Sequence, residues 1–426
     1  MAPTGRGRGF TDRLARPCRY EVVGFLDGAF GLAVAARNTL AALEASGREA
    51  VPVAVRAGRG RSASRASGAT PGAPLPDLRI YVLNPPELAV SAGQWRGLPD
   101  DAAARVLVPF WELPRIPAIW EPVVRAMDVV LAPTRFIGES FRRACPEVPV
   151  VNYPQAVFLP GAPRPDRAAF GLPAEAVVFA VVFDVGSDIE RKNPWAALQA
   201  FREAFPGDQG VRLVVKARPH PGIRAFERQL AELRMRAAAD PRVIVLERSL
   251  TYPEVLSFYA SCDVLLALHR SEGLGLHLME AMSLGRVAVA TGWSGNADFM
   301  TAADAVLIPW RMVPVRTSHG HYRSELGREG QMWAEPELAA AVEALRALRC
   351  DPELRRRMGA EAAASMERCR VEMTSGAAFR ACEEALSSPR RRDALGPALW
   401  RTRMRLRGQA VMRVLGRLAA GEGIRP

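Results

Sequence analysis

Short apolar runs that alternate with longer amphipathic segments constrain the fold of this chain more than any other feature of its sequence. In the first half the apolar runs lie at residues 20–25, 50–55, 79–83, 105–109, 128–132 and 149–151. In the second half they lie at residues 176–183, 211–217, 242–246, 263–268, 286–291 and 305–309. Strands separated by helices are typical of parallel sheets with crossover helices. The sequence therefore predicts an α/β protein built from two doubly wound domains.

Residues 159–174 hold four prolines and two glycines and are typical of a linker. We expect a first Rossmann-like domain at residues 20–158 and a second at 175–365, facing each other across a cleft. Ligands of such sheets bind at the carboxyl ends of the strands. Amphipathic patterns predict helices at residues 32–45, 136–144, 335–347 and 366–386. The last of these belongs to a C-terminal segment, residues 366–388, that can cross back to the first domain.

The net charge of +12 is concentrated at the two ends of the chain. Residues 1–19 carry +4 and residues 389–426 carry +8, so the body between them is neutral. A neutral body argues against a nucleic-acid-binding fold, and we expect no nucleic-acid partner. Residues 1–19 are expected to be disordered. The tail, residues 389–426, interleaves arginines with apolar residues and is typical of a basic amphipathic helix on an anionic membrane surface. A solvated or domain-capping helix is the alternative.

Composition also indicates the cellular compartment of the protein. No apolar run approaches the roughly 18 residues that span a bilayer, and residues 1–10 lack the apolar core of a secretory signal. The six cysteines are scattered, without a C-x-x-C pair or zinc spacing. We therefore expect a cytoplasmic protein, peripheral at the inner face of the plasma membrane where the tail binds there.

Lysine is almost absent, because Lys192 and Lys216 are the two lysines among 57 basic residues. Such a bias suggests that arginine serves wherever a cation suffices, so the two lysines mark positions that prefer a compact ammonium. The alternative is that these two lysines remain in the sequence by chance. Lys216 ends a predicted strand and would face the cleft, near a nucleotide or its phosphates. A partly buried ion pair is the alternative for this residue.

The stretch from Ser271 to Met282 carries the clearest chemical signal. It follows a predicted strand and contains a glycine turn and the start of a helix, whose unpaired N–H groups form an anion site. Gly273 and Gly275 allow a phosphate to approach the backbone. Glu272 and Glu280 suit hydroxyl donors on either side of a diphosphate. A helix cap and a solvated side chain are the alternatives for these two acids.

This stretch resembles the E-x7-E signature of retaining glycosyltransferases, most closely those of bacterial glycosyltransferase family 4, which have the GT-B fold. Phe183–Pro194 resembles the family's phosphate-binding segment, and Thr291–Met300 resembles the loop and helix after the signature. Trp333–Pro336 resembles the start of a late helix. The resemblance covers residues 176–350 well, whereas the first domain matches loosely, at Asp27–Asn38 and Phe110–Pro114.

The resemblance implies a retaining enzyme that moves a sugar from a nucleotide diphosphate sugar to a glycan or lipid-linked acceptor, in cell-surface polysaccharide synthesis. The first domain would bind the acceptor and the second the donor. No D-x-D pair of the kind that holds a divalent metal is present, and we expect neither a metal nor a cofactor.

The resemblance also assigns residues. Glu280 would bind the ribose hydroxyls, Glu272 the sugar hydroxyls and Lys192 the diphosphate, with Lys192 and Glu272 as the catalytic pair. The donor site would further include Gly273, Leu274, Gly275, Arg191, Lys216, Leu250, Thr251 and Asn296, and the first domain would contribute Gly28, Gly31, Trp111 and Glu112. A structural ion pair is the alternative for Arg191, because neighbouring side chains diverge. The alternatives for Asn296 and Trp111 are a helix cap and an ordinary packing aromatic.

Two departures from the family pattern leave other functions open. All five histidines lie in the second half, whereas many relatives have a first-domain histidine, and Gly186 stands where many carry an arginine. The alternatives are another GT-B enzyme, such as a nucleotide-sugar epimerase or a sugar phosphorylase, and a non-catalytic nucleotide-sugar-binding partner.

Overall fold

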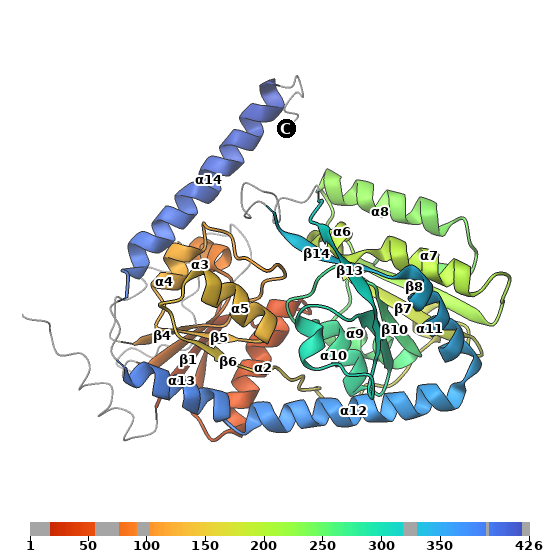
Figure 1. Cartoon of the computed structure of the whole chain (residues 1–426), viewed down its shortest axis with the longest axis horizontal. Helices are drawn as coiled ribbons and strands as arrows, with labels where there is room; N and C mark the ends of the chain where they lie inside the picture. Colours follow the sequence, from red (N-terminus) through yellow and green to blue (C-terminus); the bar gives the residue numbers. More distant parts are fainter. Residues whose placement is uncertain (1–17, 56–75, 92–102, 318–329, 389–391, 420–426) are drawn as a thin grey trace, which may run out of the picture.

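Two six-stranded parallel sheets, each covered by helices, form the framework of the computed structural model (Figure 1). The structure describes residues 18–55, 76–91, 103–317, 330–388 and 392–419, with side chains to residue 407. Most strands of both sheets are buried, which explains their continuous apolar runs. The expected α/β architecture of two doubly wound domains is confirmed.

The first sheet has the strand order β2-β1-β3-β4-β5-β6. Its strands are β1 (Tyr20–Gly24), β2 (Ala50–Ala54), β3 (Leu78–Val82), β4 (Ala104–Leu107), β5 (Val129–Ala132) and β6 (Val150–Asn152). The helices of this domain are α2 (Gly31–Ala45), α3 (Pro85–Ser91), α4 (Glu121–Arg125) and α5 (Arg135–Ala144).

The second sheet has the order β12-β11-β10-β7-β8-β9. Its strands are β7 (Val177–Asp184), β8 (Val211–Arg218), β9 (Val243–Leu246), β10 (Val264–Ala267), β11 (Val287–Thr291) and β12 (Val306–Ile308). The helices of this domain are α6 (Ile189–Lys192), α7 (Pro194–Ala204), α8 (Arg224–Ala237), α9 (Tyr252–Ser261), α10 (Leu276–Ser283) and α11 (Leu338–Cys350). An antiparallel pair, β13 (Trp310–Pro314) and β14 (Met332–Pro336), lies beside it. Short 3-10 turns are η1 (Ala168–Phe170), η2 (Val185–Ser187) and η3 (Gly295–Asp298).

The direction of winding in the second sheet reverses between β7 and β10. In open parallel sheets this switch point opens a crevice beyond the carboxyl ends of the two strands. The segments that leave these ends, residues 185–193 and 268–275, are those in which the sequence analysis found Lys192 and Glu272. The topology therefore brings the two motifs to the same edge of the sheet.

All twelve predicted strands are present, within two residues of their expected ends. Two helix predictions are wrong. Trp333–Pro336, expected to start a late helix, forms β14, because its backbone pairs with β13 and Trp333 is buried, and the helix begins at Leu338. The helix expected at residues 366–386 is divided in two, because Gly376 adopts a left-handed φ of 72°.

The C-terminal helices extend from the second domain to the first. Helix α12 (Pro352–Thr374) packs on α10 and reaches α2, and α13 (Ala377–Ser387) packs on β5 and β6. In Figure 1 this path runs along the lower side of both domains. Glu383 of α13 pairs with Arg48 at 3.1 Å and also accepts a hydrogen bond from Tyr20. Helix α14 (Leu395–Ala419) then packs on α3 and α4. No helix in the described ranges has both the length and the hydropathy for crossing a bilayer.

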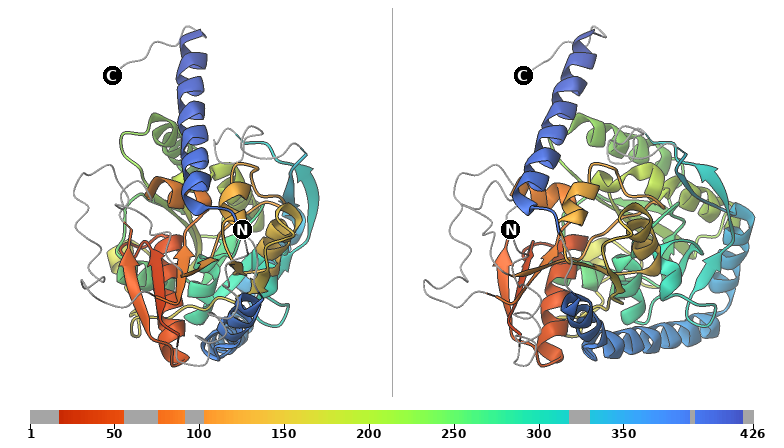
Figure 2. Two further views of the ribbon diagram at one scale, coloured as in Figure 1. Left: turned by 90° about the vertical axis from the view of Figure 1, so that its left-hand side faces the viewer. Right: turned by 60° about the vertical axis from the view of Figure 1, so that its left-hand side comes forward.

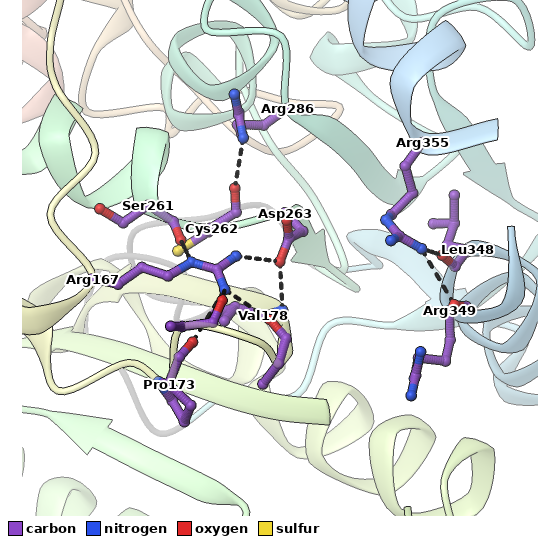
Figure 3. A network of polar contacts seen from close by, with 12 residues as sticks. Arg167, Pro173, Val178, Ser261, Cys262, Asp263, Arg286, Leu348, Arg349 and Arg355 are labelled. Carbon is purple, nitrogen blue, oxygen red and sulfur yellow. Dashed lines mark hydrogen bonds and ion pairs between the residues drawn. The ribbon is translucent and has the colours of Figure 1, made fainter. Parts of the chain in front are cut away.

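Arg167 anchors the linker to the second sheet (Figure 3). Its guanidinium donates to the carboxylate of Asp263 at 2.8 Å and to the carbonyl of Ser261 at 3.1 Å. It also donates to the carbonyls of Pro173, Ala174 and Ala176, at 3.1, 2.6 and 2.9 Å. Asp263 in turn accepts the N–H of Val178 at 2.8 Å. The planar guanidinium of Arg167 thus links the linker to the starts of β7 and β10.

We expect Arg167→Met to lower the free energy of unfolding by about 2–4 kcal/mol, because Asp263 loses its cation and several carbonyls lose a donor. Urea unfolding followed by circular dichroism would measure the change. The matched control is Arg368→Met, because the Arg368 side chain is 62% exposed and pairs with Glu361. Surface pairs contribute little, so an equal loss in both variants would contradict this role of Arg167.

Candidate functional site

Helix α6 is a single turn bracketed by two residues with unusual backbone angles. Asp188 and Asn193 have φ values of 69° and 51°, a region that residues other than glycine seldom adopt. The carboxylate of Asp188 accepts the N–H of Glu190 at 2.9 Å, and the side chain of Asn193 accepts the N–H of Ala196 at 3.4 Å. Strained residues of this kind cluster at functional sites. Here they place Arg191 and Lys192 just beyond the end of β7.

Arg191 and Lys192 both contact Glu272. Lys192 Nζ donates to Glu272 Oε1, and Arg191 Nη1 lies 3.2 Å from Oε2. Arg191 also donates to the carbonyl of Ser271 at 2.7 Å. The expectation that the two neighbouring side chains diverge is wrong. They converge because both are long and the carboxylate presents a separate oxygen to each. The structure brings Lys192, Arg191 and Glu272 together in one cluster, in which Arg191 and Glu272 are buried and Lys192 is partly buried.

Burial and charge together set the ionisation of this cluster. Burial alone would raise the pKa of Glu272, yet Lys192 and Arg191 hold that pKa well below its ordinary value. Burial lowers the pKa of Lys192, and the attraction of Glu272 opposes that shift. Burial also lowers the pKa of His269 to about 4 and that of His277 to about 3. Near pH 7 Glu272 is therefore a carboxylate and the two histidines are neutral.

The glycine turn between β10 and α10 presents unpaired donors. In the part of the chain that the structure describes, the N–H groups of Gly273, Leu274 and Gly275 make no hydrogen bond. All three residues are buried, and Gly275 has a φ of 93°. Buried backbone N–H groups normally have partners, and those at the start of a helix bind anions. The turn is therefore suited to a phosphate, as the sequence predicts.

Two segments that are distant in sequence hold this turn in place. Ser294 accepts the N–H of Glu272 at 2.8 Å, and Gly295 donates its N–H to the carbonyl of Glu272 at 2.9 Å. From the first domain, Thr134 donates its hydroxyl to the carbonyl of Gly273 at 2.8 Å. The sequence analysis missed Ser294 and Thr134 as positioning residues. Two features of the sequence could have revealed them, because Ser294 lies inside the Thr291–Met300 motif and Thr134 stands at the cap of α5.

Glu280, one of the two acids of the E-x7-E pattern, lies buried on α10. Burial raises its pKa to about 7, and the hydroxyls of Tyr252 and Tyr259 partly offset that shift. The two acids of the pattern therefore have opposite electrostatics, because Glu272 has two cations and Glu280 has hydroxyl neighbours. A carboxyl group held in an unfavourable environment is typical of a functional site.

A pocket of ≈ 870 Å³ lies between the two domains, and Tyr252 is part of its wall. The predicted residues Gly28, Lys216, Leu250 and Thr251 line it. Arg37 and Arg218, which the sequence analysis did not select, line it as well, whereas Asp27 is the acidic residue in its wall. Burial lowers the pKa of Lys216, and Asp184 opposes that shift. This excess of basic side chains favours an anionic ligand.

The first-domain candidates divide into two groups. Glu112 lies 3.8 Å from Arg191 Nη2, and Gly31 begins α2 close to Leu276 of α10. Trp111 does not point into the cleft. Its indole N–H donates to the carbonyl of Arg115 at 2.8 Å, and its ring packs 4.8 Å from that of Trp120. The alternative of a packing aromatic is the better description of this side chain.

Asn296 is fully buried, and its side chain has internal partners. Its amide donates to the carbonyl of Thr291 at 3.0 Å, and its carbonyl lies 3.0 Å from His269 Nε2. This geometry favours a structural role over a ligand contact. Gly186 leaves no cation at the position where the family resemblance implies an arginine. Arg218 lies nearby, with its Nη1 at 3.4 Å from Asp184.

Among the described residues, no group of three or more His, Cys, Asp or Glu could hold a metal ion.

Residues 181–314 match the family model described as "Glycosyl transferases group 1". This region is a group 1 glycosyltransferase domain. It contains Lys192, Lys216, Glu272 and Glu280. The expected enzyme class, a glycosyltransferase, is thereby confirmed. No curated protein matches the chain in sequence.

Solved structures support the same fold. TarM of S. aureus is 9% identical with a TM-score of 0.50, over 73% of this chain and 55% of TarM. HepE of Anabaena is 13% identical with a TM-score of 0.56, over 86% of this chain and 99% of HepE. Sucrose-phosphate synthase from Thermosynechococcus elongatus is 14% identical with a TM-score of 0.59, over 86% of this chain and 100% of that one. The chain thus spans about half the length of TarM. The GT-B fold expected for the glycosyltransferase domain and its partner domain is confirmed.

We expect Gly295→Ala to displace the glycine turn, because an added methyl group would lie 1.8 Å from the carbonyl oxygen of Gly273. Overpacking of this kind lowers the free energy of unfolding by about 1–3 kcal/mol, measurable by urea denaturation. Gly396→Ala is the matched control, because no atom lies within 4 Å of its added methyl group. A loss of the same size in the control would refute the steric explanation.

We also expect Glu280→Gln to stabilise the protein at neutral and higher pH. The folded pKa of about 7 lies above the ordinary value of 4.5, so the wild type loses stability as the pH rises from about 4.5 through 7. The loss amounts to about 3 kcal/mol and is absent below pH 4.5, where the carboxyl group is protonated in both states. Urea unfolding of both proteins at pH 4 and pH 8 would test this. A difference that does not change with pH would contradict it.

Proposed function

We propose that the protein is a retaining glycosyltransferase of the family 4 type, which transfers a sugar from a nucleoside diphosphate to a glycan or lipid-linked acceptor in cell-surface polysaccharide synthesis. One observation carries the proposal. A carboxylate with two cations, Glu272 with Lys192 and Arg191, adjoins three unpaired backbone N–H groups at the switch point of the second sheet. That combination fits a sugar hydroxyl and a diphosphate side by side.

The pocket suggests how the nucleoside is oriented. The base would lie against Leu250 and Thr251, and the ribose hydroxyls would donate to Glu280 behind Tyr252. Binding would then add further donors to the buried carboxyl group of Glu280, beside the hydroxyls of Tyr252 and Tyr259. TarM and HepE were both crystallised with UDP, which makes UDP the first nucleotide to test.

Stabilisation of the developing charges would lower the barrier to the reaction. As the bond between the anomeric carbon and the diphosphate oxygen breaks, negative charge develops on the leaving diphosphate and positive charge on the sugar ring. Lys192 and the N–H groups of the turn would stabilise the former, and the carboxylate of Glu272 the latter. The acceptor hydroxyl forms the new bond on the same face, and its proton passes to the leaving phosphate oxygen. Neither a protein base nor a covalent intermediate is then required.

Arg191 would have a supporting part in this scheme. In the structure both cations hold Glu272, so the carboxylate stays compensated when Lys192 turns towards a diphosphate. An uncompensated carboxylate at this depth would be costly. Arg191 is therefore a positioning residue, whereas Lys192 touches the reacting groups.

We expect Lys192→Ala to lower turnover about a hundredfold or more, on the scale of losing a group that stabilises developing charge. The measurement is the initial rate of nucleotide release once a donor has been found. That donor is identified beforehand by screening UDP, GDP and ADP for a rise in melting temperature. Lys216→Ala is the matched control, because its pocket position predicts a change in KM more than in kcat. Wild-type turnover by Lys192→Ala would remove this lysine from the mechanism.

Product analysis separates the alternatives. A transferase consumes the nucleotide sugar only when an acceptor is present, an epimerase needs none, and a phosphorylase needs free phosphate. A non-catalytic binding protein would be stabilised by the nucleotide without forming any product.

A further inference from the structure

The proposed function leaves helix α14 unexplained. It is 25 residues long, which corresponds to about 37 Å, and it projects beyond the two domains (Figures 1 and 2). Its first part packs against α3 and α4 of the first domain.

The first half of α14 is firmly attached. Leu395, Ala398 and Leu399 are buried in the core of the first domain, and Leu406 packs partly against it. Thr402 is buried as well and donates its hydroxyl to the carbonyl of Ile119 at 3.3 Å. These residues form one face of the helix. The opposite face therefore has a defined direction relative to the first domain.

That opposite face is apolar along its middle and basic along its sides. Trp400 and Met404 are 63% and 44% exposed, and they lie one turn apart on the same side of the helix. The helical repeat places Arg401 and Arg405 on one side of this pair and Arg403 and Arg407 on the other. On the neighbouring α3, Val90 is 53% exposed. We call the surface formed by Trp400, Met404 and these four arginines the α14 face.

The charge of this segment selects the kind of partner. Between Asp393 and Glu422 the sequence has six arginines and no acidic residue. Two copies of the α14 face would repel each other, which argues against a second copy of the chain as the partner. An anionic lipid bilayer satisfies both features, because its headgroups attract arginine and its interface accommodates tryptophan.

We propose that the α14 face docks on the surface of an anionic lipid bilayer, with Trp400 and Met404 at headgroup level and the arginines on the phosphates. The helix would lie on the bilayer and not cross it. If the proposed function holds, docking brings the first domain, expected to take the acceptor, next to the membrane. The acceptor class would then be lipid-linked, and this last step rests on the proposed function.

The test uses the full chain and sedimentation with vesicles. We expect binding to vesicles of phosphatidylcholine with 30% phosphatidylglycerol, little binding to pure phosphatidylcholine, and loss of binding at high salt. Replacing Arg401, Arg403, Arg405 and Arg407 by glutamine should weaken partitioning about a hundredfold or more. Trp400→Ser with Met404→Ser should weaken it about tenfold.

The matched control removes four arginines from α12, namely Arg356, Arg357, Arg368 and Arg370, also as glutamine. It has the same net charge as the α14 arginine variant, and it should keep wild-type binding. Equal losses in both variants would show that net charge alone acts and would overturn the proposal. So would absence of binding to the anionic vesicles, or a lipid-independent dimer that the Trp400 and Met404 substitutions abolish.

A second readout separates this proposal from the proposed function. Stabilisation by nucleotide, measured on the same variants, should be unchanged, because the α14 face lies outside the pocket lining. Vesicle binding without any nucleotide effect would support docking and count against the donor site. Nucleotide stabilisation without vesicle binding would do the reverse.

Discussion

The carboxylate of Glu272, buried between Lys192 and Arg191, is the interaction on which the geometry of the site depends. A charge at this depth is tolerated because each oxygen has its own cation. Since Glu272 follows β10 and the cations follow β7, the cluster joins the two strands that flank the switch point. Arg191 also holds the carbonyl of Ser271, so one guanidinium fixes both the charge and the backbone of the glycine turn.

The first domain supports the same turn from the other side. Thr134 holds the carbonyl of Gly273, and Ser271 donates its hydroxyl to the carbonyl of Glu112. Arg135 pairs with Asp298 at 3.2 Å next to these contacts. The glycine turn is therefore a point of contact between the domains as well as the proposed anion site. Any relative movement of the domains would therefore act directly on this turn.

The sequence predicted the framework and the acids of the site because both depend on local pattern. Buried parallel strands require unbroken apolar runs, and a glycine turn before a helix exposes N–H groups wherever the helix lies. Predictions failed where a distant partner decided the outcome. Trp333–Pro336 became a strand through pairing with β13, and Trp111 turned into the core towards Trp120. Ser294 and Thr134 escaped notice because their partners are 22 and 139 residues away.

The sequence by itself determined the two α/β domains, the strand ends and the residues that follow them, since periodicity and turn residues are encoded over a few positions. The tertiary structure alone decided which of these residues meet. Lys192 and Glu272 are 80 residues apart, and Arg191 joins them only because α6 is a single turn beside the segment that follows β10. It also decided that the pKa of Glu272 falls while that of Glu280 rises. Burial and neighbouring charge set the ionisation of a group, and both arise when distant segments pack together.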